Sequence, residues 1–342
     1  MTKVSQWQRI AMLAAGISAG MVSVAWGGNG SLYELHSSGE IWRYTGTPCN
    51  GGVCSGWQEL DNNPSTIQIV AGGAQLYELH QTGSVWMFTG QICSGGACQG
   101  WTQIDDNQGI EIFGYGGQLY QWRQDFSLWR FTGHACSGGS CNGWVQIDDG
   151  LSLPKNVYSG ATGLYETRGS FTGDYSLWMF TGAPCTAEFT CPGWVEIDST
   201  QTSYPQMASG AAGAYEFLPN GEIRGYNGPQ CSGNSCPGWQ MVGNSANTNQ
   251  IAAGGGLYQG RSDGSIWQYQ GIPCWGNICN SWVQIDNNPG MAYIVAGIAT
   301  VYEVHYDGSI WQYNGTPCNG YVCSSWTELD NNPQNVSVVA DL

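Results

Sequence analysis

The chain repeats one unit of about 44 residues seven times, and this repetition restricts the possible folds more than any other feature. When the units are aligned on a Leu-Tyr dipeptide or its equivalent, successive units begin 43 to 50 positions apart. A fixed period of this size is typical of propeller blades or solenoid turns. The seven units begin near Leu32, Leu76, Leu119, Leu164, Ala214, Leu257 and Val301.

Each unit contains four short segments that have the composition of β-strands. In the first unit they cover residues 32–36, 41–44, 57–61 and 67–71, and they are rich in β-branched and aromatic side chains. Gly-containing turns separate them, and no segment shows helical periodicity. Seven four-stranded units predict an all-β, seven-bladed β-propeller.

The two ends of the repeat region predict how the ring closes. The first unit begins at its second strand, while residues 336–340 at the other end match the inner strand over residues 67–71. We therefore expect the C-terminal strand to complete the first blade, which removes the open edge that a linear array would expose. Residues 22–28 also resemble an inner strand and would compete with the C-terminal one if they stayed attached.

The first 25 residues have the features of a secretory signal peptide. Lys3 and Arg9 precede an apolar stretch over residues 10–24, and Ser23-Val24-Ala25 has the small-x-small pattern of a cleavage site, with a cut after Ala19 as the alternative. No later stretch approaches 18 apolar residues, so we expect no membrane span. The mature domain, residues 26–342, is then secreted to the exterior or to a periplasm.

All 14 cysteines fall into seven local pairs, one in each unit between the third and fourth strands. In a secreted chain such pairs predict one disulfide per blade. Zinc is the rival interpretation, but no histidine recurs beside the pairs, and separate blades would hold them apart. The predicted disulfides join Cys49 with Cys54, Cys93 with Cys98, Cys136 with Cys141, Cys185 with Cys191, Cys231 with Cys236, Cys274 with Cys279, and Cys318 with Cys323.

The chain is strongly acidic, with a formal net charge of -16. Loss of Lys3 and Arg9 would leave seven basic against 25 acidic residues, a net charge of -18. Such a chain repels phosphate groups, so we expect neither nucleic-acid binding nor binding to anionic membranes.

Many acidic residues fall in two sets of turns that a four-stranded blade places on the same face of the disc. This predicts a negative face that would suit a basic protein partner. Calcium is an alternative, since it prefers clustered oxygen ligands. No segment has the spacing of a calcium loop, however, and we predict no metal or cofactor. The residues are Asp61, Asp105, Asp106, Asp148, Asp149, Asp198, Asp286 and Asp330 after the fourth strands, and Asp125, Asp174, Asp263 and Asp307 after the second.

Two series of tryptophans recur in the units. One opens the fourth strand in all seven units: Trp57, Trp101, Trp144, Trp194, Trp239, Trp282 and Trp326. The other lies in the third strand of six units: Trp42, Trp86, Trp129, Trp178, Trp267 and Trp311. Both series could pack between neighbouring blades. Alternatively, third-strand indoles expose a face on which a sugar ring stacks, because aromatic rings offer large contact area at low entropic cost.

A basic residue ends the second strand in six units, and a Glu or Gln lies two positions before it. The basic residues are His36, His80, Arg123, Arg168, Arg261 and His305. The Glu or Gln recurs in all seven units, including the fifth, which has Leu218 in place of the basic residue: Glu34, Glu78, Gln121, Glu166, Glu216, Gln259 and Glu303. With a two-residue turn, Glu34 would lie opposite Arg43, and Gln121 opposite Arg130, so cross-strand pairing could explain them. The functional interpretation makes them hydrogen-bonding partners for a ligand beside the third-strand Trp.

The fifth unit departs from the others at these positions. It has Arg224 in place of the third-strand Trp, Leu218 in place of the basic residue and Gly243 in place of the Asp that follows the fourth strand. It keeps Cys231, Cys236 and its fourth-strand Trp. We interpret it as a blade without a binding site.

The repeat LYELHSSGEIWRYTGTPCNGGVCSGWQELDNNP resembles repeats of secreted bacterial proteins and, more distantly, those of tectonin-type and other β-propeller lectins. The resemblance covers residues 32–342 and implies a propeller that recognises glycans. We expect a multivalent carbohydrate-binding protein. The alternative is a scaffold for extracellular surface proteins, and the oligomeric state stays open. Catalysis is not expected, since paired carboxylates recur in every unit rather than in one site.

Overall fold

The computed structural model describes residues 31–72, 75–115, 117–151, 154–169, 175–186, 190–201, 205–233 and 235–340. The predicted signal peptide with its two cleavage positions, the strand-like segment 22–28 and Asp174 lie outside these residues. No described segment forms an apolar helix long enough to cross a bilayer.

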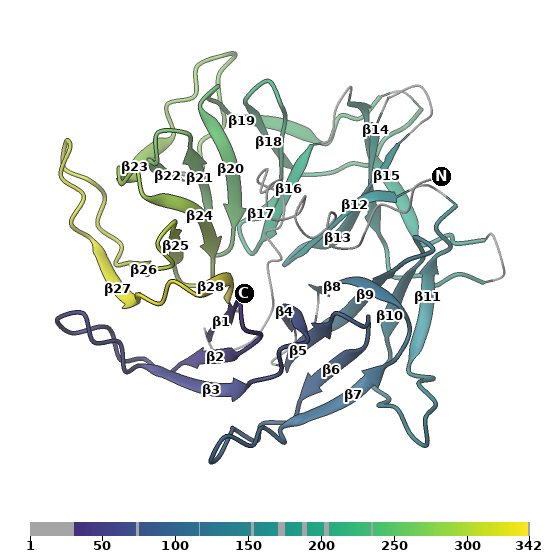
Figure 1. Ribbon diagram of the computed structural model, residues 1–342. Helices are drawn as coiled ribbons and strands as arrows, with labels where there is room; N and C mark the ends of the chain where they lie inside the picture. The colour runs from purple at the N-terminus through teal and green to yellow at the C-terminus, as the bar shows by residue number, and fades with distance from the viewer. Residues whose placement is uncertain are drawn as a thin grey trace, which may run out of the picture.

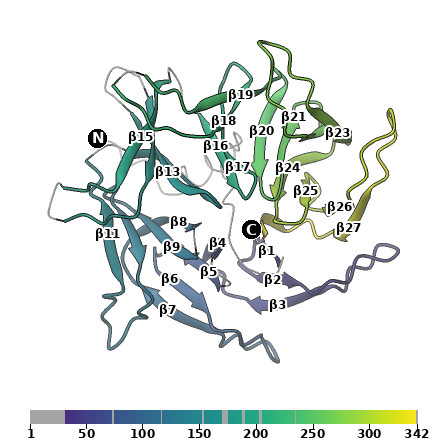
Figure 2. The same cartoon turned by 180° about the vertical axis from the view of Figure 1, so that it is seen from behind.

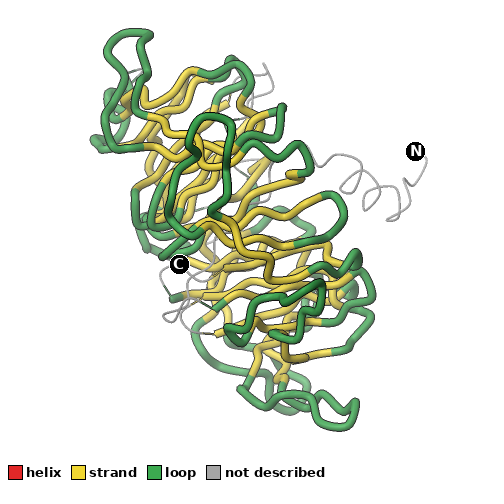
Figure 3. The backbone as a smooth tube through the Cα atoms, turned by 90° about the vertical axis from the view of Figure 1, so that its left-hand side faces the viewer, coloured by secondary structure: helices red, strands yellow, loops and turns green. Residues whose placement is uncertain are grey.

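The described residues form a ring of seven four-stranded antiparallel sheets, as predicted (Figures 1 and 2). In six of the sheets the strands follow chain order from the axis to the rim, and in the seventh the inner strand comes from the C-terminal end of the chain. The edge-on view shows the strands crossing a disc with loops on both faces (Figure 3). The strand bounds are those expected from the repeat to within a few residues, because each strand is a short β-branched or aromatic run between turn residues.

Blades I to IV carry these strands, from axis to rim. Blade I has β28 (Asn335–Ala340), β1 (Leu32–His36), β2 (Ile41–Tyr44) and β3 (Trp57–Asp61). Blade II has β4 (Thr66–Gly72), β5 (Gln75–His80), β6 (Val85–Phe88) and β7 (Trp101–Asp105). Blade III has β8 (Gly109–Tyr115), β9 (Gln118–Arg123), β10 (Leu128–Phe131) and β11 (Trp144–Asp148). Blade IV has β12 (Pro154–Gly160), β13 (Gly163–Gly169), β14 (Tyr175–Phe180) and β15 (Trp194–Gln201).

Blades V to VII continue in the same order. Blade V has β16 (Gln206–Gly210), β17 (Gly213–Phe217), β18 (Glu222–Tyr226) and β19 (Trp239–Asn244). Blade VI has β20 (Thr248–Ala253), β21 (Leu257–Arg261), β22 (Ile266–Tyr269) and β23 (Trp282–Asp286). Blade VII has β24 (Met291–Ala296), β25 (Val301–His305), β26 (Ile310–Tyr313) and β27 (Trp326–Asp330).

The last strand of the chain completes the first blade, which confirms the predicted closure. β28 pairs antiparallel with β1, with Leu32 opposite Ala340 and Glu34 opposite Val338. Figure 1 shows the C-terminus beside β1 near the axis. The inner strand of blade I therefore comes from the opposite end of the chain, and β1 has a partner on both sides.

The hydrophobic core lies between blades rather than within them. Each of the seven blade–blade interfaces holds its own cluster of buried aliphatic and aromatic side chains. Between blades I and II, Leu35, Ile41 and Leu60 of one sheet pack on Ile69 and Leu76 of the next. Because the interface between blades VII and I is built in the same way, the hydrophobic core continues through the interface that closes the ring.

Two hydrogen bonds cross every interface and fix the outer strand of each blade to its neighbour. The indole N–H of the fourth-strand Trp donates to a carbonyl of the preceding blade, as from Trp57 to Leu329 at 2.8 Å, and this bond recurs in all seven blades. The N–H of the first cysteine in each loop donates one residue earlier, as from Cys49 to Glu328 at 3.0 Å. The fourth-strand Trp series is therefore an inter-blade contact.

Seven disulfides, one per blade, confirm the predicted cysteine pairing, and no free cysteine remains. Each joins residues five or six positions apart and closes the loop between the third and fourth strands, which extends from the outer rim (Figure 1). Disulfides in this number are typical of proteins from an oxidising compartment. The bonds are Cys49–Cys54, Cys93–Cys98, Cys136–Cys141, Cys185–Cys191, Cys231–Cys236, Cys274–Cys279 and Cys318–Cys323. Each bond restrains the same loop that reaches back to the preceding blade.

The turn between the second and third strands is one residue longer than expected, which corrects the predicted pairing. The N–H of His36 bonds the carbonyl of Glu40, and Gly39 takes a left-handed φ of 92°, as in a three-residue hairpin turn. The extra residue moves the register by one, so Glu34 lies opposite Trp42 instead of Arg43. Likewise, Gln121 lies opposite Trp129 instead of Arg130.

We expect the double variant Cys49→Ser, Cys54→Ser to lower the free energy of unfolding by roughly 2 kcal/mol, since closing a loop of this size removes about that much chain entropy from the unfolded state. Denaturant unfolding under non-reducing conditions measures the change. The variant Ser38→Ala, in an exposed turn of the same blade, is the control and should change stability by less than about 0.5 kcal/mol. Equal stability of the two proteins would contradict the stabilising role.

The contribution of the C-terminal strand to closure can be tested within β28 itself. Val339 is fully buried between blades I and II, whereas Val336 is 53% exposed. Val339→Ala should lower the free energy of unfolding by about 2 kcal/mol, from lost burial plus a cavity. Val336→Ala should leave it nearly unchanged. Thermal unfolding of the two variants measures both changes in stability. Equal effects would contradict the placement of β28 as the inner strand of blade I.

Candidate functional site

The six third-strand tryptophans lie on strands β2, β6, β10, β14, β22 and β26, each directly opposite the Glu or Gln of the second strand. The pairs are Glu34–Trp42, Glu78–Trp86, Gln121–Trp129, Glu166–Trp178, Gln259–Trp267 and Glu303–Trp311. Directly opposed residues project from the same face of a sheet. The structure therefore brings these two predicted sets of residues together, and each Trp stays partly exposed.

The basic residue at the end of each second strand covers one face of the Trp. The imidazole rings of His36, His80 and His305 stack on Trp42, Trp86 and Trp311 with centroids 5.6 to 5.9 Å apart. The guanidinium carbons of Arg123, Arg168 and Arg261 lie 4.1 to 4.2 Å from the ring centroids of Trp129, Trp178 and Trp267. A sugar could stack only on what these cationic groups leave uncovered.

In blades I, II, III, IV and VII the Glu or Gln holds the basic residue in place over the indole. His36 Nε2 lies 2.9 Å from Glu34 Oε1, and Arg123 Nε donates to Gln121 Oε1 at 2.9 Å. Arg168 bonds Glu166 in the same way. Each of these five blades thus positions its cation with its own second strand and third strand.

A buried Asp from the preceding blade completes this cluster. Its exposed fraction is 6% or less in the six units that have it: Asp61, Asp105, Asp148, Asp198, Asp286 and Asp330. A β-bulge at the end of the fourth strand turns this side chain toward the next blade, as the register change between Ile41 and Trp42 records for Asp61. Arg168 meets Asp148 at 3.1 Å and Arg123 meets Asp105 at 3.6 Å.

This burial corrects part of the prediction of a strongly negative face, while the other part holds for four exposed turn residues, Asp106, Asp125, Asp263 and Asp307. The two sets of turns do share a face, since the carbonyl of Gly83 accepts a bond from Gly109. The Asp residues that end the fourth strands are nevertheless buried and bonded to the next turn, as Asp61 Oδ2 is to the N–H of Asn63. Their charge is used inside the interfaces and not displayed on the surface.

Burial shifts the protonation of these clusters. It raises the pKa of Glu34 to about 7 and that of Glu303 to about 6, against the opposing effect of the neighbouring His36 and His305. Burial alone would lower the pKa of each histidine, but the bond to its glutamate outweighs this and raises the pKa. The Glu–His pairs of blades I and VII therefore retain protons at pH values where an unfolded chain has released them.

Blade V fills its own interface in a different way. Arg224, in the place of the third-strand Trp, donates to Glu222 Oε1 at 2.7 Å and lies 3.4 Å from Glu216 Oε1. It also reaches Asp198 of blade IV at 3.9 Å. The arginine occupies the position of the missing indole and basic residue together, so no cation–indole pair forms in this blade.

The interface between blades V and VI contains an open cleft of about 280 Å³. Gly243 lies at the bulge of the fourth strand of blade V, opposite Ile223, where the other six units have the buried Asp. Without that carboxylate the space beside Arg261 and Trp267 stays open. The lining residues are Gly243, Asn244, Ser245, Gln259, Arg261, Trp267, Cys279, Asn280 and Trp282.

Sequence reasoning singled out several residues of this cleft but did not place them together in one site, and it missed Asn244, Ser245 and Asn280. Gly243 was a visible departure and predicted that blade V lacks a site. Because the bulge directs this position across the interface, its loss opens space in front of blade VI instead. The cleft-lining role of Trp282 had no sequence signal of its own, since Trp282 belongs to a series common to all units.

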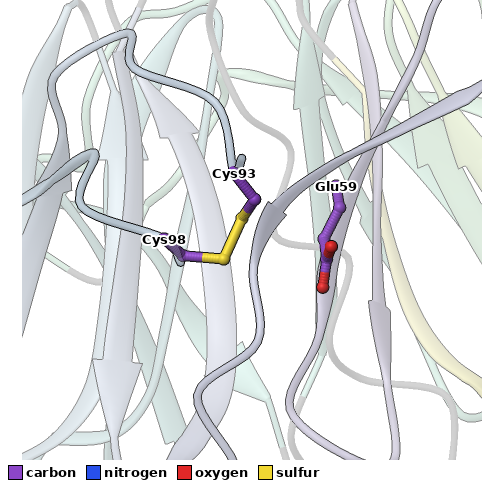
Figure 4. Close-up of side chains that lie close together, drawn as sticks. All are labelled: Glu59, Cys93 and Cys98. Atoms are coloured by element: carbon purple, nitrogen blue, oxygen red, sulfur yellow. A yellow bond between two sulfur atoms is a disulfide. The ribbon is translucent and has the colours of Figure 1, made fainter. Parts of the chain in front are cut away.

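One group in the described part has atoms placed like metal ligands, but its chemistry does not suit a metal. The carboxylate of Glu59 and the sulfurs of Cys93 and Cys98 lie within 4.8 Å of one another (Figure 4). The two sulfurs form a disulfide. A thiolate, not a disulfide sulfur, ligates metals. The grouping reflects the loop of blade II that rests on the outer strand of blade I.

No protein-family model and no curated protein sequence matches this chain. Among solved structures, Prp20p from Saccharomyces cerevisiae, described with its binding to Gsp1p and histones, is similar with a TM-score of 0.54 and 11% identity over 91% of this chain and 88% of that chain. Yeast RCC1 (Prp20) bound to Kap60 gives 0.51 and 10% over 85% and 80%. The Aleuria aurantia lectin in complex with Fucα1-6GlcNAc gives 0.39 and 13% over 77% and 93%. At these identities, the likeness to the two yeast structures shows a shared fold and does not reach to ligands.

The Glu–His pairs of blades I and VII predict that stability falls as the pH rises from about 5 to 8, since ordinary Glu and His pKa values are near 4.3 and 6.5. The folded state binds more protons than the unfolded state in this window, so raising the pH favours unfolding. Urea unfolding at pH 5 and pH 8 measures the difference.

The double variant Glu34→Gln, Glu303→Gln should flatten this dependence, because Gln keeps a hydrogen-bonding oxygen without a titrating proton. Blade III already has a Gln at this position, and the side-chain oxygen of Gln121 accepts a hydrogen bond from the basic residue Arg123. A variant with the slope of the original protein would show that other groups cause the pH dependence.

Proposed function

We propose that this protein is a secreted carbohydrate-binding propeller without catalytic function, and that its principal site is the cleft between blades V and VI. The observation that carries the proposal is the convergence of two indoles, Trp267 and Trp282, with amide and hydroxyl side chains around one opening. Aromatic faces bind the apolar face of a sugar ring, and amide and hydroxyl groups bond its hydroxyls.

The dimensions of the cleft favour a small unit of a larger ligand. Its volume of about 280 Å³ lies just below the range of roughly 300–1,000 Å³ for pockets that hold drug-sized molecules. One sugar residue at the end or within a chain fits this size. The polar lining from Asn244, Ser245 and Asn280 supplies both hydrogen-bond donors and acceptors.

The other interfaces bear on the predicted multivalency. Five further blades present the same Trp under a His or Arg, but in each the preceding blade contributes its buried Asp. We therefore expect one strong site per chain, with the five others weaker because their cations are already paired. Binding stoichiometry by titration calorimetry distinguishes this from six equivalent sites.

We expect Trp267→Ala to weaken binding of a saccharide ligand about tenfold, because an aromatic contact contributes roughly 0.5–1.5 kcal/mol beyond its buried area. A glycan array identifies the ligand, and titration calorimetry measures the affinity. Trp129→Ala is the matched control, since Trp129 lies under an arginine that faces Asp105. Equal losses in the two variants, or no saccharide bound, would contradict the proposed site.

A second candidate function, a scaffold for extracellular proteins, is favoured by apolar side chains at the rim. Trp275 is 90% exposed and Tyr321 is 95% exposed, each in the disulfide loop of its blade. Their neighbours Ile278 and Val322 are also exposed. This version does not depend on an acidic face. It predicts that Trp275→Ser and Tyr321→Ser abolish capture of a protein partner and leave saccharide affinity unchanged.

A further inference from the structure

Arg261 differs from the other cations of the blade interfaces because nothing in the described part neutralises it. In blades III and IV, the equivalent Arg123 and Arg168 each meet a buried Asp of the preceding blade. Blade V has Gly243 at that position, and no described carboxylate lies within ion-pairing distance of Arg261. The carboxylate that acts on it electrostatically is Asp263, in its own exposed turn.

A second substitution removes the other partner that this arginine would have. In blade III, Gln121 Oε1 accepts a bond from Arg123 Nε. The matching oxygen of Gln259 instead accepts a bond from the Thr248 hydroxyl at 2.7 Å. Blade III has Gly109 in the place of Thr248, opposite its arginine in the same register. As a result, Arg261 Nε is buried without a hydrogen-bond partner.

An arginine that lacks both of these partners can bind an anion that enters the cleft. The guanidinium stays charged in a protein, and its planar fork matches the two oxygens of a carboxylate. A buried donor without a partner costs more free energy than a bonded one, and a ligand that supplies the acceptor regains it. Trp267 holds the guanidinium carbon 4.2 Å above its ring, which fixes the direction of the fork.

We infer that the cleft between blades V and VI binds the carboxylate of an acidic sugar. The ligand carboxylate pairs with Arg261, as a buried Asp of the preceding blade pairs with the equivalent arginine in blades III and IV. The inference rests on the proposed function and names the chemical class of its ligand. The ligand carboxylate replaces the Asp side chain that Gly243 lacks, while Trp282 and Asn280 line the part of the cleft that receives the ring.

The net charge of -16 opposes this ligand only at long range. Charges farther away than a Debye length, about 8 Å at physiological salt, are largely screened. Within the cleft the lining side chains other than Arg261 are uncharged. Added salt should therefore weaken binding only by screening the attraction between the ligand carboxylate and Arg261.

The test compares matched acidic and neutral sugars by titration calorimetry: oligosaccharides ending in glucuronic acid against glucose, in galacturonic acid against galactose, and sialyllactose against lactose. At least one acidic member should bind about ten- to a hundredfold more tightly than its neutral match, as expected for hydrogen bonds between charged groups. Arg261→Gln should remove this preference.

Gly243→Asp is the sharpest variant, because it restores the carboxylate that six other units carry. A Cβ at Gly243 would lie 3.2 to 3.3 Å from its nearest neighbours, side-chain atoms of Ile223 and Trp282, so a side chain requires only small movements. It should abolish the preference for acidic sugars. Gly243→Asn has the same size without charge and is the control for filling of the cleft. It should keep the preference between acidic and neutral ligands even if both bind more weakly.

The outcomes separate this inference from the proposed function. Equal binding of the acidic and neutral members, with Gly243→Asp and Gly243→Asn behaving alike, would overturn the inference and leave saccharide binding intact. Absence of binding by all members would overturn both. Binding of an acidic peptide in place of every sugar, sensitive to Gly243→Asp, would keep the role of Arg261 but overturn the assignment to saccharides.

Discussion

The ring depends on a pair of hydrogen bonds that each blade makes with the outer strand of the blade before it. An outermost strand would normally present unpaired carbonyls at the rim, where they invite pairing with other chains. Here the fourth-strand indole N–H and the first cysteine N–H of the next blade bond two successive carbonyls, as Trp101 and Cys93 do with Leu60 and Glu59. Each such bond contributes about 1 kcal/mol, but their main effect is to fix the angle between sheets.

The polar clusters between blades use this fixed geometry. Burial of an ion pair is costly, so the clusters are weak contributors to stability unless every member has a partner. The residues of the cluster differ between blades while their positions in the fold stay the same: Glu pairs with His in blade I, Gln with Arg in blade III, and Glu with Arg in blade IV. Because the backbone register is the same throughout, one substitution at a bulge changes the chemistry of one interface and leaves the ring intact.

Much of the fold follows from the sequence because its determinants are local. The strand 41–44 is a short run between turn residues, and its expected bounds equal those of β2. Cysteines separated by five or six positions, such as Cys136 and Cys141 or Cys185 and Cys191, have only one near partner, so their pairing was predictable. The closing strand was recognisable because residues 336–340 repeat the pattern of an inner strand. Each of these features can be understood within a single unit of the repeat.

The site could not be predicted in the same way, because it depends on register and on contacts between units. A single added turn residue moved Glu34 from opposite Arg43 to opposite Trp42. The bulge that turns Asp61 toward blade II has no distinct sequence signal, so a buried residue was expected at the surface. For the same reason, the loss of the Asp at Gly243 was interpreted within blade V, whereas it acts on Arg261 of blade VI.

The short span of the disulfides also bears on how the chain is made. The two cysteines of each pair are five or six positions apart, from Cys49 and Cys54 in the first unit to Cys318 and Cys323 in the last. Each pair can therefore form its disulfide within a single loop while the chain is being synthesised. The sulfurs of later units are not yet present at that moment. Closing so small a loop involves little search. Oxidation can thus proceed unit by unit, and the correct set of bonds forms without the reshuffling that long-range cystines require.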